Sequence, residues 1–128
     1  MSIQNRVLPI IVFSQFCCTS LWFAGNAVMG DLLESFSLES SALGHLTSAV
    51  QIGFIFGTLI FAILTIADRF ATSKVFLISA VLGAVFNLGT TFNNNTFPSL
   101  FFFRFMTGFF LAGIYPVGMK IASDFFKK

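Results

Sequence analysis

Long apolar runs separated by short polar stretches dominate the hydropathy pattern of this chain. A bilayer core about 30 Å thick requires about 20 apolar residues in helical form, and four runs meet this requirement. They cover residues 7–30, 46–67, 75–92 and 99–119, approximately. The first run is longer than the roughly 7–15 apolar residues of a signal peptide. The pattern therefore predicts four transmembrane helices.

The polar connections between these runs are short. Residues 31–45 carry three acidic side chains and no lysine or arginine, whereas residues 68–74 read DRFATSK. Residues 93–99 read NNNTFPS, a composition that favours turns. We therefore expect an all-α membrane protein whose residues 1–128 form a single membrane domain, with the four helices crossing in alternation.

Composition excludes several classes of protein. Charged residues make up 9% of the 128 residues and hydrophobic residues 56%, whereas an average soluble domain carries about 25% charge. The net charge of +2 is too small to indicate nucleic-acid binding. The adjacent Cys17 and Cys18 lie in an apolar run, and we interpret them as packing residues rather than as a disulfide or metal site.

The sequence lacks the patterns of a catalytic centre. We find no Ser–His–Asp arrangement, no metal-ligand spacing and no phosphate-binding loop, and the single histidine, His45, lies at the start of a predicted helix. We therefore expect neither an enzyme nor a bound metal or cofactor.

The placement of the cations predicts the orientation, because lysine and arginine concentrate in cytoplasmic loops. With four alternating crossings, the cations near the helix ends all fall on the side of the two termini and residues 68–74. We therefore predict cytoplasmic termini in a multi-pass protein of the cytoplasmic (inner) or plasma membrane, with residues 31–45 and 93–99 facing outward. These cations are Arg6, Arg69, Lys74, Lys127 and Lys128.

The fourth run contains two cations in one apolar segment. Arg104 and Lys120 are 16 residues apart, or about 24 Å along a helix, which is less than the thickness of the hydrocarbon core. If Lys120 snorkels to the cytoplasmic interface, Arg104 lies roughly 8 Å inside the outer half of the core. A buried membrane arginine indicates a functional site, and a snorkelling interfacial arginine is the alternative.

Two helix faces carry the candidate site residues. On a continuous helix, Tyr115 lies within about 40° of Arg104, together with glycine and leucine residues. In the first run, Gln15, Trp22 and Asn26 share one face at positions i, i+7 and i+11. These faces indicate a cavity wall, and a simple hydrogen-bonding role between helices explains the second face equally well.

Small residues predict where helices approach closely. Ala49, Gly53 and Gly57 recur at four-residue spacing, which is typical of tight helix packing in membranes. We expect this row to serve packing within the chain rather than a homodimer. The other glycines expected at helix contacts are Gly108, Gly113 and Gly118.

Two stretches resemble motifs of the major facilitator superfamily. Residues 57–74, GTLIFAILTIADRFATSK, are similar to its loop pattern Gly-x-Leu-x-Asp-Arg-x-Gly-Arg-Arg, with Asp68, Arg69 and Lys74 at charged positions. Residues 104–120, RFMTGFFLAGIYPVGMK, resemble its fourth helix, which contains the pattern Arg-x-x-x-Gly. The resemblance covers nearly the whole chain. The sequence departs from the loop pattern at both glycines and the next arginine, which are Leu64, Ala71 and Thr72 here.

The resemblance implies the start of the amino-terminal half of a major facilitator fold, which has two six-helix halves. It also implies secondary transport of a small solute by alternating access, with or without coupled protons. We expect a fragment inactive alone, whose partners are the bilayer, the solute and the remaining helices or a partner chain. The candidates for contact with the solute or a coupled proton are Arg104, Tyr115, Asn26, Gln15 and Trp22.

In that family the loop carboxylate, Asp68 here, engages a helix of the second half. The chain contains no second half, so Asp68 and Arg69 are expected to form a local pair that marks the cytoplasmic face.

Two other functions stay open. A four-helix exporter of the small multidrug resistance type, acting as a dimer, fits the chain length, but it needs a buried carboxylate in the first helix. Residues 7–30 contain none. The other alternative is a membrane scaffold or subunit that does not transport.

Overall fold

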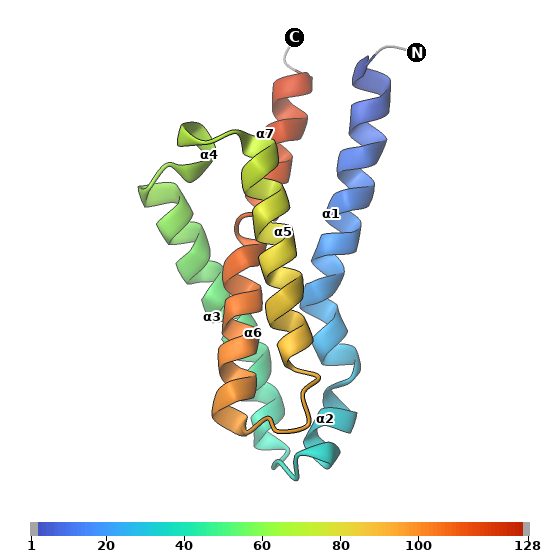
Figure 1. Cartoon of the computed structure of the whole chain (residues 1–128), viewed down its shortest axis with the longest axis vertical. Helices are drawn as coiled ribbons and strands as arrows, with labels where there is room; N and C mark the ends of the chain where they lie inside the picture. Colours follow the sequence, from blue (N-terminus) through green and yellow to red (C-terminus); the bar gives the residue numbers. More distant parts are fainter. Residues whose placement is uncertain (1–2, 127–128) are drawn as a thin grey trace.

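The computed structural model describes residues 3–126, and all the regular secondary structure in this range is helical (Figure 1). Lys127 and Lys128, two of the cations used to predict the orientation, lie outside the described residues. The helices are α1 (Ile3–Ala27), α2 (Met29–Ser35), α3 (Ser41–Ile63), α4 (Ile66–Arg69), α5 (Thr72–Gly89), α6 (Phe97–Leu111) and α7 (Tyr115–Phe125).

Four segments of the described chain are long and apolar enough to cross a membrane. The prediction of an all-helical protein with four candidate spans is therefore confirmed. α3 and α5 both begin and end a few residues earlier than the apolar runs indicated, and the fourth span continues to the end of α7. The spans are Asn5–Ala27, Ser41–Ile63, Thr72–Gly89 and Phe97–Phe125.

The helices form one elongated bundle in which α6 contacts α3, α5 and α1. The start of α1, the end of α7 and the short helix α4 lie at one end of the bundle, which we call the α4 end (Figure 1). α2 and the connection from α5 to α6 lie at the opposite end. α3 leans away from α5 and α7 toward the α4 end, where α4 bridges the separation between them (Figure 1).

Glycines bring the backbones of α3 and α6 into direct contact. A Cβ atom at Gly53 would collide with the carbonyl oxygen of Phe105, and one at Gly57 would also meet the α6 backbone. From α6, a Cβ at Gly108 would collide with the carbonyl oxygen of Val50. In a bilayer, such close approach supplies the packing that holds helices together. The partner of the small-residue row is thus a helix of the same chain.

The acidic connection 31–45 is largely helical, so the interpretation of this stretch as a loop is wrong. Met29 of α2 is buried in a cluster with Leu46 and Leu100, and the partly buried Leu32 and Phe36 pack against it. These apolar residues recur at helical spacing and cover one end of the bundle. The acidic residues between them, Asp31 and Glu34, are exposed. Their presence made the helical spacing of the apolar residues hard to recognise in the sequence.

The fourth span is interrupted between α6 and α7. Pro116 has no backbone N–H, and its ring conflicts with the carbonyl four residues earlier, at Ala112. The chain passes the interruption with tight i to i−3 hydrogen bonds, and Pro116 then lies in the first turn of α7, where proline is well tolerated. The donors of these bonds are the N–H groups of Ala112, Gly113 and Ile114.

Candidate functional site

Arg104 is buried in the bundle, with 1% of its surface exposed. Its Nη2 donates to the carbonyl oxygen of Trp22 at 3.2 Å and to Oδ1 of Asn26 at 3.4 Å, both on α1. Its Nε and Nη1 are also buried and have no hydrogen-bond partner among residues 3–126. Two donors of Arg104 are therefore unsatisfied within the described part of the chain, which is costly for a buried cation.

Gly25 of α1 provides the space that the guanidinium group occupies. A Cβ atom at this position would collide with Nη1 of Arg104 and lie 2.5 Å from its Cζ. Glycine therefore allows the close approach of the Arg104 side chain to the α1 backbone at this position. The sequence analysis missed Gly25, and the one hint was a glycine immediately before the polar Asn26.

Trp22 connects the arginine to a third helix. While its carbonyl oxygen accepts from Arg104, its ring packs edge-on against Phe54 of α3, with 5.5 Å between ring centroids. The structure thus groups Arg104, Trp22, Gly25 and Asn26, which we call the Arg104 cluster. Helices α1, α3 and α6 meet there, so a shift of any of them changes the surroundings of the arginine.

Gln15 and Tyr115 lie outside the Arg104 cluster. Nε2 of Gln15 donates to the carbonyl oxygen of Tyr115 at 2.8 Å, and Gly118 leaves room for this side chain, since a Cβ there would lie 2.7 Å from Nε2. The side chain of Tyr115 is 53% exposed. The predicted face shared by Arg104 and Tyr115 does not form, because the span is interrupted between them.

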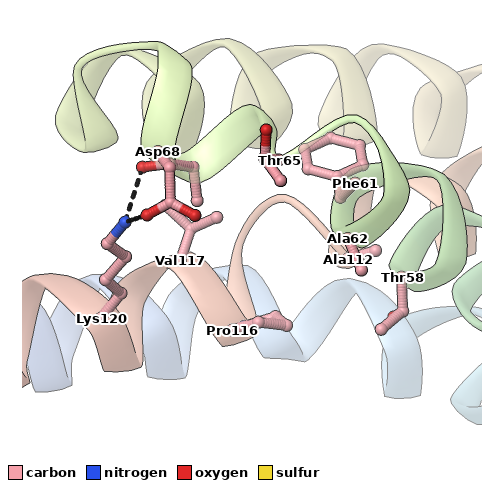
Figure 2. Close-up of a pocket in the computed structure, with 10 residues that line it drawn as sticks. Thr58, Phe61, Ala62, Thr65, Asp68, Ala112, Pro116, Val117 and Lys120 are labelled. Atoms are coloured by element: carbon pink, nitrogen blue, oxygen red, sulfur yellow. Dashed lines mark hydrogen bonds and ion pairs between the residues drawn. The ribbon is translucent and has the colours of Figure 1, made fainter.

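A second set of polar contacts links α4 to α7. Nζ of Lys120 donates to the carbonyl oxygen of Ala67 at 2.9 Å and forms an ion pair with the carboxylate of Asp68 (Figure 2). Nε of Arg69 instead donates to Oγ1 of Thr65 at 3.1 Å. The expected local pair of Asp68 with Arg69 is therefore wrong, because neighbouring side chains on a helical turn point about 100° apart.

The turn from α3 into α4 uses an uncommon backbone conformation. Thr65 has φ 48° and ψ 40°, in the left-handed region. Glycine is the usual residue at this position after a helix, and a β-branched residue there is strained. The hydrogen bond from Arg69 to Thr65 partly offsets this strain. Lys74, in the first turn of α5, has an exposed side chain and lines an open pocket together with Arg69.

Comparison with known proteins identifies the family. The model of the Major Facilitator Superfamily matches residues 11–128, and the chain belongs to this superfamily. It is therefore a multi-pass membrane protein of a transporter family and not an enzyme. No solved structure matches it significantly.

A curated relative is the 3-(3-hydroxy-phenyl)propionate transporter of Escherichia coli (strain K12), which is 31% identical over 101 residues. The alignment covers 79% of this chain and 24% of the relative. The chain thus spans about a quarter of the length of the curated relative that it matches.

Proposed function

We propose that this chain is the amino-terminal four-helix portion of a secondary transporter that moves a small carboxylate by alternating access. The observation that carries the proposal is the buried Arg104, whose Nε and Nη1 have no partner in the described part of the chain. Each of these nitrogens carries an N–H group that a carboxylate oxygen can accept, and hydrogen bonds between a guanidinium group and a carboxylate are among the strong ones in proteins. The name of the bacterial relative specifies a propionate, a solute with the same chemical group.

The proposed contact with a carboxylate depends on the position of Arg104 between α1 and α6. Its bonds to Trp22 and Asn26 are long, at 3.2 and 3.4 Å, whereas charge-assisted bonds to a carboxylate are about 2.7–2.9 Å and stronger. Binding a carboxylate therefore satisfies donors that α1 leaves unused. Because α1 and α6 both contribute to the Arg104 cluster, occupancy of the site depends on how these helices are placed, as alternating access requires.

We propose that the α4 end faces the cytoplasm. Arg6, Arg69 and Lys74 lie at this end of the bundle, and cations near the ends of membrane helices favour the cytoplasmic side. The opposite end carries the acidic α2 and the Asn-rich connection. We also propose that transport requires further chain beyond this portion, since the match covers 24% of the relative, so that the chain alone does not transport.

The proposed carboxylate contact is testable on the chain itself, because Trp22 is the single tryptophan and belongs to the Arg104 cluster. In bilayer nanodiscs, 3-phenylpropionate is expected to change Trp22 fluorescence in a saturable way, whereas the neutral 3-phenylpropanol is not. Arg104→Gln should abolish this response, and Arg6→Gln, which removes an exposed cation outside the cluster, should preserve it.

Equal responses to the acid and the alcohol, or an unchanged response in Arg104→Gln, would contradict the carboxylate contact. Uptake by the chain alone in proteoliposomes would contradict its dependence on further helices. Circular dichroism of each variant checks that the helices are retained.

A further inference from the structure

An open pocket of about 470 Å³ lies at the α4 end, between the end of α3, α4 and the start of α5. It occurs where α3 leans away from the bundle (Figure 1). Two cations, Arg69 and Lys74, line it, and most of its other lining is apolar. The main apolar residues are Phe61, Ile66, Val75, Ile78 and Phe110.

The two cations are available to an anion. Nε of Arg69 donates to Oγ1 of Thr65, which holds the guanidinium group at the pocket, and the described part of the chain offers no hydrogen-bond acceptor to its two Nη atoms. Among residues 3–126, the structure gives neither Arg69 nor Lys74 a carboxylate partner, and Asp68, the nearest acid in sequence, is paired with Lys120. The pocket therefore carries uncompensated positive charge.

The surroundings of the pocket select the kind of anion. Large apolar side chains around it are exposed on the outside of the helices, including Phe70 at 63%, Leu77 at 63% and Ile78 at 58%. When this chain alone is placed in a bilayer, this outer surface meets lipid. A soluble anion would leave the apolar wall empty, and a peptide would need partners for its backbone groups. A ligand with an anionic head and an apolar tail satisfies both parts.

We propose that this pocket binds one anionic phospholipid from the leaflet at the α4 end. Its phosphate accepts from Arg69 and Lys74, and one acyl chain lies against Ile78 and Phe110. Basic pockets between membrane helices commonly hold anionic headgroups, and the volume is within the range of about 300–1,000 Å³ for small-ligand sites. The lipid bridges α4 and α5, and so supports the strained turn at Thr65. The site is separate from the Arg104 cluster and does not depend on the proposed transport.

Native mass spectrometry of the chain tests this proposal. The chain is reconstituted in vesicles that contain equal amounts of phosphatidylcholine and phosphatidylglycerol and is then released in detergent. We expect one phosphatidylglycerol to remain bound in preference to phosphatidylcholine. Each of Arg69→Gln and Lys74→Gln should weaken retention about fivefold, as expected for one cation near a membrane surface. The matched variant Arg6→Gln removes one cation at the same end but outside the pocket, and should retain the lipid.

A second variant separates a bound lipid from general attraction to an anionic surface. Ile78→Trp keeps both cations and fills the apolar part of the pocket, so it should also lose the retained phosphatidylglycerol. Circular dichroism confirms that each variant is folded. The proposal is overturned if both lipids are retained equally, if Arg6→Gln has the same effect as Arg69→Gln, or if Ile78→Trp retains the lipid like the wild type.

Discussion

Gly25→Ala is expected to destabilise the bundle, because α1 and α6 meet at this position without space for a methyl group. The added Cβ would collide with Nη1 of Arg104 and lie 2.5 Å from its Cζ. The guanidinium group cannot simply move aside, since the residue is only 1% exposed. Any displacement also sacrifices its bonds to Trp22 and Asn26.

Two opposing contributions determine the size of this effect. Alanine stabilises a helix interior by about 0.5–1 kcal/mol relative to glycine, whereas overpacking a core costs about 1–3 kcal/mol. The net expected loss in the free energy of unfolding therefore lies between about 0 and 2.5 kcal/mol, with a central value of about 1 kcal/mol. Gly44→Ala in α3 is the matched control, because a Cβ there meets no atom within 4 Å. It should be neutral or slightly stabilising.

The assay is reversible unfolding in mixed micelles with increasing dodecyl sulfate, followed by circular dichroism and by the fluorescence of Trp22. The decisive comparison is made in an Arg104→Met background, which removes the guanidinium group that the new methyl group would meet. There the penalty of Gly25→Ala should fall by about 1 kcal/mol or more, as for directly contacting residues. A Gly25→Ala variant as stable as Gly44→Ala, or a penalty unchanged by Arg104→Met, would refute the reasoning.

Three further predictions concern other parts of the chain. Gly53→Val should cost about 3 kcal/mol or more in unfolding, because the new side chain meets the carbonyl of Phe105 rather than a flexible side chain; a loss below that of Gly25→Ala would contradict this. Thr65→Gly should raise the free energy of unfolding by about 1 kcal/mol through relief of the strain of the left-handed conformation. A lower melting temperature for this variant than for the wild type would argue against strain at Thr65. In a cysteine-free variant, Ser35→Cys should react with an impermeant maleimide from outside the cell and Ser73→Cys only after permeabilisation, and the reverse pattern would invert the proposed orientation.

Hydropathy was sufficient to locate the four spans, because the length and apolar character of a membrane helix are properties of contiguous residues. The spacing of Arg104 to Lys120 predicted that Arg104 lies inside the hydrocarbon core, since the two cations are too close to reach opposite interfaces. Its burial between α1 and α6 is instead a property of helix packing, which the spacing along the sequence did not indicate.

The details that sequence reasoning missed depend on contacts between distant segments. The partner of Asp68 is Lys120, 52 residues away, and no local pattern indicated that α7 passes beside α4. The importance of Gly25 similarly arises only when α6 brings Arg104 against α1. Helical angles were extended from Arg104 to Tyr115 through residues 112–114, where the helix is interrupted, so these two residues do not share one continuous helical face.

The interruption between α6 and α7 makes the fourth span two rods joined by a short hinge. One rod, α6, is fixed to α3 by backbone contact at Gly53 and Gly108. The other rod, α7, has different attachments: Gln15 of α1 donates to its first residue, and Lys120 holds α4. A tilt of α1 therefore pulls on both rods, through Arg104 on one and through Tyr115 on the other. We therefore expect the interruption to let α7 and α4 follow such a tilt while the backbone contact between α3 and α6 is kept.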